Sequence, residues 1–318
     1  MRDYILRRLL LIAPIMVGVS FLTYSIFNLI PGDAAVLICQ FNCTPETLRD
    51  IRHDLGLDQP FYEQYGDWLV NIAQGDLGKS FFGGLPVATE LGRRLPVTGE
   101  LMILTMLFGL FLGIPPGVLS AIRPGTPIDW IARFASVVWL SVPSFYLGIL
   151  IITFGAIWFG YTPPQFGASG TVPFFENPWL NMQTYFFPAL VLAVGISAVI
   201  MRLTRSSMLE VMRNDYIRTA WSKGLRERTV VWRHALKNAL IPVTTIVGLQ
   251  IGALIGGSVI IESVFSLNGV GKYVLEAILR RDLLVVQSMV LIFAVTYVLA
   301  NLLVDLGYAW LDPRIRYG

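Results

Sequence analysis

The sequence predicts an all-α integral membrane protein with six transmembrane helices. Of its 318 residues, 55% are hydrophobic and only 14% are charged, whereas soluble domains carry about 25% charged residues. Six runs without a charged residue approach or exceed the length of about 20 residues that crosses the hydrocarbon of a bilayer. Because lipid offers the backbone no hydrogen bonds, such runs form helices rather than open strands.

The six predicted spans cover residues 9–30, 101–122, 134–160, 185–201, 238–261 and 283–304. The first is longer than the apolar region of about 7 to 15 residues in a cleaved signal peptide, and no small-x-small cleavage site follows it closely. We therefore expect it to remain as a membrane anchor. The third span contains Pro143. The fifth contains four glycines that allow close helix approach, namely Gly248, Gly252, Gly256 and Gly257.

The distribution of Lys and Arg predicts the orientation of these spans. With the N-terminus in the cytoplasm, 16 of the 24 basic residues lie in inner segments and eight lie outside. Short inner connections of membrane proteins carry this excess of positive charge. Both termini are therefore expected to be cytoplasmic.

The polar segment 31–99 after the first span predicts a small extracytoplasmic subdomain. It contains two candidate helices, 45–55 and 59–72, the first of them preceded by Thr44 as a cap. The chain then divides into three parts: the N-terminal segment with the first span (1–30), this subdomain (31–99), and a five-helix core (100–318) that includes a cytoplasmic connection, 202–238.

Both cysteines of the chain, Cys39 and Cys43, lie in this external segment. An oxidising compartment favours a disulfide between them, although a four-residue spacing permits one only if the backbone brings the Cα atoms close enough. Two free, buried thiols are the alternative. No histidine or third cysteine lies nearby, so we expect no metal site.

Residues 73–80, Ala-Gln-Gly-Asp-Leu-Gly-Lys-Ser, fit a loosened phosphate-loop pattern. A phosphate loop follows a buried strand and begins a helix, whereas this segment follows a helical pattern and leads into Phe81-Phe82-Gly83-Gly84. We expect no nucleotide binding here. The two phenylalanines beside two glycines instead predict a mobile apolar tip that contacts a partner, or else a rigid cap over the outer mouth.

The connection 202–238 is strongly basic and predicts two helices on the inner face of the membrane. The first covers 215–223 and ends at Gly224, a suitable helix C-cap, and the second covers 227–239. A basic surface held near anionic lipid is one interpretation. The apolar area of Tyr216, Ile217 and Trp221 favours a protein partner instead.

These residues resemble the permease subunits of binding-protein-dependent ABC importers. Ala220 and Gly224 match the coupling motif of that family, and the wider strings 215–225 and 233–242 resemble its dipeptide, oligopeptide and nickel class. Further matches are Ile-Pro-Gly-Asp at 30–33, Leu-Pro-Val-Thr-Gly-Glu-Leu at 95–101, Ser-Val-Pro-Ser-Phe at 141–145 and Leu-Asp-Pro-Arg at 311–314. The chain looks like the first of the two permeases of that class. Asn268 departs from the usual Pro-Gly-x-Gly, but asparagine tolerates turns.

The resemblance implies a type I, MetI-like importer permease in a bacterial or archaeal cytoplasmic membrane. It implies a second homologous permease, two ATPases that bind ATP and Mg, and an extracytoplasmic solute-binding protein as partners. The chain itself is then a non-catalytic subunit without cofactor, metal or nucleic acid. The residues expected to contact an ATPase are Asp215, Tyr216, Ile217, Arg218, Thr219, Ala220, Trp221, Lys223 and Gly224.

A translocation path needs polar groups at membrane depth, where they are costly on a lipid-facing surface. The candidates are Ser141, Ser144, Gln250, Glu262, Asn301 and Asp305. A hydrogen bond between helices is the alternative for Gln250, and hydration at the ends of the spans is the alternative for Glu262 and Asp305. His53 and His234 are too isolated to predict a catalytic or metal site.

Di- and oligopeptides are the expected substrates, with nickel, glutathione or oligosaccharides as alternatives within the same class of transporter. A stand-alone secondary transporter or channel needs paired intramembrane charges or an inverted repeat, and neither is visible. An intramembrane hydrolase needs a His-Glu-x-x-His motif or paired intramembrane aspartates, and the sequence has neither.

Overall fold

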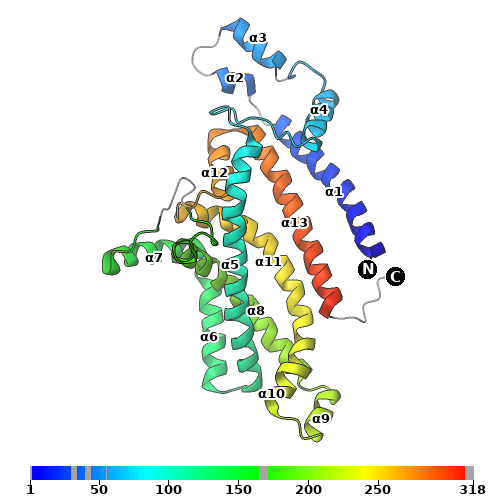
Figure 1. The fold of residues 1–318 in the computed structure, drawn as a ribbon, viewed down its shortest axis with the longest axis vertical. Helices are drawn as coiled ribbons and strands as arrows, with labels where there is room; N and C mark the ends of the chain where they lie inside the picture. Colours follow the sequence, from blue (N-terminus) through cyan, green and yellow to red (C-terminus); the bar gives the residue numbers. More distant parts are fainter. Residues whose placement is uncertain (1, 30–33, 40–43, 55, 165–170, 312–318) are drawn as a thin grey trace. The chain divides into compact units, whose positions relative to one another are not determined.

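The computed structural model describes the chain apart from residues 1, 30–33, 40–43, 55, 165–170 and 312–318 (Figure 1). In the described part, helices form nearly all the regular structure, and the β-structure is an isolated bridge between Lys79 and Pro86. The predicted all-α class is confirmed. The chain separates into two compact units, residues 1–96 with 272–298 and residues 97–271 with 299–318.

The first unit contains the helices of the segment that follows the first predicted span. Its elements are α1 (Arg2–Leu29), α2 (Ala34–Cys39), α3 (Pro45–Asp54), α4 (Phe61–Ala73), most of α12 (Val270–Arg280) and the start of α13 (Leu283–Leu311). Helices α3 and α4 match the two predicted helices closely. Thr44 caps α3 by accepting a 3.2 Å hydrogen bond from the amide of Thr47. Aromatic side chains join α1 to α4, with the rings of Tyr24 and Trp68 5.1 Å apart.

The second unit is built around a long helix, α8. Its elements are most of α5 (Val87–Ile122), then α6 (Pro127–Ser141), α7 (Ser144–Phe159), α8 (Pro178–Val211), α9 (Asp215–Ser222), α10 (Glu227–Thr229), the π-helical turn η2 (Val230–Ala235) and α11 (Leu236–Val264). Helix α8 packs against α6, α7 and α11. Of its most apolar 18-residue stretch, 56% is buried, which makes α8 the centre of this unit.

Four helices in the described chain are long and apolar enough to cross a membrane. They are Val87–Ile122, Pro178–Val211, Glu227–Val264 and Leu283–Leu302, and α1 adds the shorter apolar stretch Ala13–Ile26. The third predicted span is two helices rather than one, because α6 and α7 meet at 94°. Pro143 explains the break: it lacks an amide hydrogen and holds Val142 before it in an extended conformation.

Close helix packing also uses glycines of α5 that were not singled out from the sequence. A Cβ atom on Gly113 of α5 would lie 2.7 Å from Cγ2 of Ile200 on α8, and one on Gly117 would lie 2.8 Å from the carbonyl oxygen of Met201. A Cβ atom on Gly256 of α11 would meet no heavy atom within 4 Å. A Cβ atom on Gly257 would lie 3.4 Å from Cδ2 of Leu192 on α8, an ordinary contact distance, so α5 approaches α8 more tightly than α11 does at these positions.

Candidate functional site

Helix α9 forms the predicted short helix and ends where the sequence indicates. Gly224 follows it with a φ of 72°, in the left-handed region that glycine adopts without strain. The amide of Gly224 donates to the carbonyl oxygen of Trp221, and that of Leu225 donates to the carbonyl oxygen of Ala220. These two bonds are those of a Schellman motif, so the end of α9 is fixed by its backbone.

The two faces of α9 have different surroundings. Ile217 and Ala220 are buried and pack in an apolar cluster with Met208 of α8 and Val231 of η2. Tyr216 and Trp221 remain 43% and 42% exposed. Anchoring on one face leaves large aromatic area on the other, which is typical of a surface that binds another protein.

The remaining predicted coupling residues lie on the exposed side. Arg218 forms a 3.3 Å ion pair with Asp215, and both side chains are largely exposed, so this pair adds little stability. Thr219 and Lys223 are exposed as well. The phenolic oxygen of Tyr216 accepts a 2.8 Å hydrogen bond from Nδ2 of Asn238, which fixes the ring relative to α11.

The predicted helix 227–239 is interrupted by a π-helical turn, η2, between α10 and α11. The side chains of Val230, Val231 and Ala235 in this turn are buried against the cluster that holds α9. π-helical turns are rare and are frequent at functional sites. Along the chain, α10 and this turn connect α9 to α11, and Figure 1 shows α9 and α10 at the N-terminal end of α11.

A buried ion pair near the same end of the second unit was not predicted from the sequence. Asp129 of α6 is 1% exposed and accepts from both Nε and Nη2 of Arg205 on α8, at 2.8 and 2.9 Å. Ser120 of α5 donates to the same carboxylate. Three helices are thereby tied together. The sequence did contain one signal for this pair. Asp129 and Arg205 carry opposite charges, and both lie just beyond predicted spans on the same predicted side of the membrane.

A cavity of about 370 Å³ lies at the break between α6 and α7. It is lined by residues of α6, α7, α8 and α11 and the short link between α6 and α7: Trp139, Leu140, Val142, Pro143, Ser144, Leu147, Val191, Leu192, Val194, Gly195, Ile196, Val199, Gln250, Ala253, Leu254 and Gly257. Of the predicted path residues, Ser144 and Gln250 are brought together here. Ser141 is exposed, and its hydroxyl donates to the carbonyl oxygen of Val137.

Glu262 lies in a buried network instead of the hydrated position that was the alternative. Its side chain is 0% exposed and accepts a 2.7 Å hydrogen bond from Thr98. The hydroxyl oxygen of Thr98 in turn accepts from the amide of Val270. A Cβ atom on Gly269 would collide with the Glu262 carboxylate. The turn 268–271 is therefore packed directly against Glu262.

The other predicted residues lie elsewhere. Asn301 is half-buried in α13 and does not line the cavity. Asp305 is also in α13, and its side chain lies outside the described part of the chain. Cys39 ends α2, while Cys43 lies outside the described residues, so the disulfide stays a prediction.

The aromatic turn that contains Phe81 and Phe82 is anchored rather than free. The carboxylate of Asp282, only 2% exposed, accepts hydrogen bonds from the Ser80 hydroxyl and the Phe81 amide. Phe81 and Phe82 are half-buried. The segment 73–80, which resembles a phosphate loop, follows α4 and enters this turn, so it begins no helix.

Two family models match nearly all of the chain. The model described as "Binding-protein-dependent transport system inner membrane component" matches residues 113–317, and the model of the N-terminal part of such membrane components matches residues 1–105. The chain belongs to this family. The resemblance seen in the coupling segment is therefore confirmed, and so is the assignment to a membrane transport system.

Relatives of this inner membrane component match over its full length. A dipeptide transport system permease protein of Alkalihalophilus pseudofirmus is 39% identical over 333 residues, and a glutathione transport system permease protein of Pectobacterium atrosepticum is 39% identical over 318 residues; both alignments cover 100% of each chain. An inward-facing structure of the MetNI methionine ABC transporter has a TM-score of 0.55 at 18% identity, covering 70% of this chain and 96% of that one. The expected MetI-like fold is confirmed.

Proposed function

We propose that this inner membrane component forms, with a second homologous permease, the translocation path of an ATP-driven importer of di- and oligopeptides. The observation that carries the proposal is the orientation of α9, which is anchored by Ile217 and Ala220 and exposes Tyr216 and Trp221. Relatives named as dipeptide and oligopeptide permeases support the substrate class. The chain is a non-catalytic subunit, and both termini face the cytoplasm.

Helix α9 is the element through which a partner ATPase acts. Tyr216 and Trp221 insert into a groove of the ATPase as apolar anchors, and Arg218 and Lys223 add charge complementarity. Because the helix is fixed at its end by the Gly224 turn and on one face by the buried cluster, movement of the ATPase shifts it as a rigid body. The two partner ATPases bind ATP and Mg, and this chain binds neither of these two ligands.

The movement of α9 reaches the spanning helices through two sets of contacts. The apolar cluster joins α9 to α8 and η2, and the pair Asp129–Arg205 joins α8 to α6. Helix α6 leads directly to the break at Pro143 and to the cavity there. A displacement of α9 therefore changes the shape of this cavity. Alternating access requires such a connection, in which one element shifts the protein between two conformations.

The cavity at the break supplies part of the path. Its volume, about 370 Å³, is within the range of about 300 to 1,000 Å³ for small-molecule sites. Ser144 and Gln250 provide hydrogen-bonding groups in an otherwise apolar lining, which suits the amide groups of a peptide without selecting its side chains. An extracytoplasmic binding protein then selects the substrate.

Glutathione is a second candidate substrate because a full-length relative carries that name. The complex should be reconstituted in liposomes with its partner permease, ATPases and binding protein. Labelled dipeptide, glutathione and Ni²⁺ are then compared for uptake and for stimulation of ATP hydrolysis. Dipeptide should stimulate both. If uptake and ATP hydrolysis are stimulated only by Ni²⁺ or only by glutathione, and not by dipeptide, the peptide assignment is rejected.

The coupling role is tested in the same liposomes with Trp221→Ala. We expect peptide uptake to fall about tenfold. Loss of an aromatic anchor typically costs about 1 to 2 kcal/mol of binding free energy, and about 1.4 kcal/mol corresponds to a tenfold change in affinity. Trp179→Ala is the matched control, because Trp179 is 70% exposed at the start of α8 and away from α9. Equal loss in both variants would reject a specific role for Trp221.

A further inference from the structure

Helix α4 packs against α1 through aromatic side chains. The rings of Phe61 and Tyr65 on α4 lie 6.1 and 5.5 Å from the ring of Phe21 on α1. The hydroxyl oxygen of Tyr65 is 2.9 Å from that of Ser20, and Ser20 is only 2% exposed. Both helices belong to the first unit. These contacts therefore fix the position of α4 along α1.

The part of α1 that α4 contacts lies in the middle of the first predicted span. At the rise of an α-helix, Ser20 is about 15 Å along α1 from each end of the span 9–30. That distance is about half of a hydrocarbon layer of about 30 Å. Ser20 is also near the middle of the apolar stretch Ala13–Ile26. With α1 as the first span, a helix that stayed in the water outside the membrane would not reach this position.

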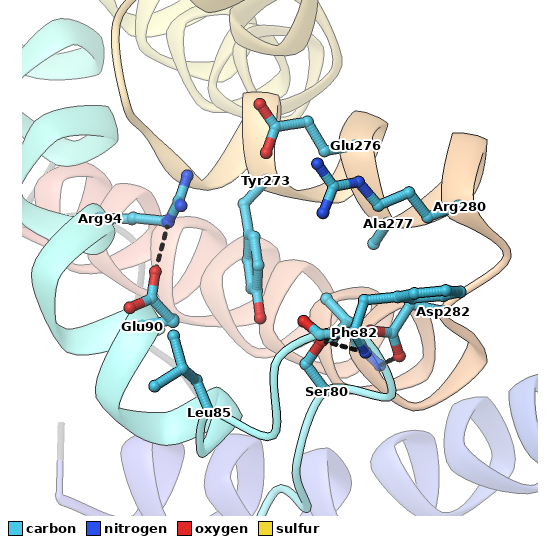
Figure 2. A pocket seen from close by; sticks show the side chains of 11 residues that line it. Ser80, Phe82, Leu85, Glu90, Arg94, Tyr273, Glu276, Ala277, Arg280 and Asp282 are labelled. Atoms are coloured by element: carbon cyan, nitrogen blue, oxygen red, sulfur yellow. Dashed lines mark hydrogen bonds and ion pairs between the residues drawn. The ribbon is translucent and has the colours of Figure 1, made fainter. Parts of the chain in front are cut away.

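A second side of α4 is polar and opens onto a separate cavity of about 780 Å³. Asp67 lines this cavity from α4, and Lys79 lines it from the segment that follows α4. One wall is fixed, because the hydroxyl of Ser80 donates to Asp282 (Figure 2). Glu63 lies within about 40° of Asp67 around the helix. Charged groups at membrane depth are tolerated where they face such a polar cavity, so these carboxylates are compatible with a helix in the membrane.

The third side of α4 is apolar and exposed. Around the helix, the residues of this side fall within an arc of about 100° that contains no charged residue. We name them the α4 stripe: Tyr62, Leu69, Val70 and Ala73. The side chains of Tyr62 and Val70 are 70% and 54% exposed. A helix with one apolar face and one polar face is typical of a boundary between lipid and water.

We propose that α4 is embedded in the outer leaflet of the membrane, with the α4 stripe against the acyl chains and Asp67 on the polar cavity. Lipid covers the stripe because α4 is held on α1 at membrane depth, where hydrocarbon is the surrounding medium. The segment 31–99 is then partly in the membrane instead of entirely outside it. This inference goes beyond the proposed function, because it concerns neither the substrate nor the ATPases. The proposed orientation of the N-terminus serves only to name the leaflet.

The test is spin labelling of the complete transporter in lipid nanodiscs, without binding protein. The chain lacks Cys39 and Cys43, the exposed cysteines of the partner subunits are replaced, and a nitroxide is attached to Tyr62→Cys or Val70→Cys. Asp67→Cys, on the polar side of the same helix, is the matched control. Electron paramagnetic resonance measures collisions with oxygen, which concentrates in lipid, and with water-soluble chromium oxalate. The ratio of oxygen to chromium collisions should be several-fold higher at Tyr62 and Val70 than at Asp67.

Two results would overturn the inference. Equally low ratios at all three positions would place α4 in water. Few collisions with either reagent at Tyr62 and Val70 would mean that protein, such as the second permease, covers the α4 stripe. Thermal unfolding checks that each labelled complex is assembled, and Ala73→Cys replaces a position that is not tolerated. The collision ratios do not depend on the transported substrate, so their failure would leave the proposed function standing.

Discussion

Thr98 Oγ1 donates a 2.7 Å hydrogen bond to Oε1 of Glu262, 164 residues further along the chain. The same oxygen accepts a 2.8 Å hydrogen bond from the amide of Val270. One hydroxyl therefore connects the first part of α5, the end of α11 and the start of α12. All three groups are buried, so water does not replace a lost bond.

Replacing Thr98 by Val should destabilise the second unit by about 1 to 3 kcal/mol, because the amide of Val270 then loses its acceptor inside the protein. Thermal unfolding of the detergent-solubilised protein measures the loss. Thr98→Ser keeps the hydroxyl and should retain most of the stability. If the Val and Ser variants unfold at the same temperature, the hydroxyl contributes nothing.

Replacing Asp129 by Ala should cost about 3 to 5 kcal/mol, since it leaves Arg205 without its partner. The double replacement with Arg205→Met should cost much less than the two single changes summed, because no unpaired charge remains. Unfolding temperatures of the four proteins form a double-mutant cycle. Simple additivity would contradict the close pair seen here.

Replacing Gly224 should impair coupling through the backbone alone, because a Cβ atom there would meet nothing within 4 Å. Non-glycine residues in the left-handed conformation cost about 1 to 2 kcal/mol, and asparagine tolerates it best. Peptide uptake per ATP hydrolysed should fall least in Gly224→Asn, more in Gly224→Ala and most in Gly224→Val. Normal uptake by the Val variant at normal expression would exclude a role for this turn.

Replacing Gln250 by Leu, and separately Ser144 by Ala, should lower peptide uptake several-fold while the protein remains folded, because these two side chains supply polar groups to the cavity at the break. Ser141→Ala is the matched control: its hydroxyl bonds its own helix. Uptake assays with equal amounts of each complex decide the matter. A loss with Ser141→Ala as large as with Ser144→Ala would contradict this part of the path.

Cys39 and Cys43 should form a disulfide. Its loop is short, so its stabilisation should be below the roughly 3 kcal/mol expected for a 15-residue loop. Mass spectrometry of the non-reduced protein should find neither thiol alkylated. Alkylation of both would exclude the bridge.

The sequence was sufficient for features that depend on local pattern. The limits of α3 and α4, the end of α9 at Gly224 and the outward position of Trp221 follow from capping, helix period and glycine conformation. Features that depend on contacts across the chain were not visible. The pair Asp129–Arg205 needs two distant helices side by side, and the burial of Glu262 needs Thr98.

Two expectations differed from the structure because one chemical pattern permits two conformations. Gly83 and Gly84 beside Phe81 and Phe82 left a mobile tip and a rigid cap both open, and the hydrogen bond from the Phe81 amide to Asp282, a residue in another connection, favours the anchored form. Pro143 was visible in the third span, yet a proline in a membrane helix produces anything from a slight kink to a complete break. The surrounding helices determine which of these forms.

The right-angled break at Pro143 affects how the chain enters the membrane. With 15 and 16 residues, α6 and α7 are each about 22 to 24 Å long, shorter than a hydrocarbon layer of about 30 Å. In the folded chain α8, which is synthesised later, packs against both halves, and α11 packs against α7. We therefore expect this third predicted span to take its final position only after the fourth helix has been synthesised. In a variant lacking Cys39 and Cys43, a cysteine at Ser144 should react faster with a water-soluble maleimide in chains that end at Phe159 than in the full chain.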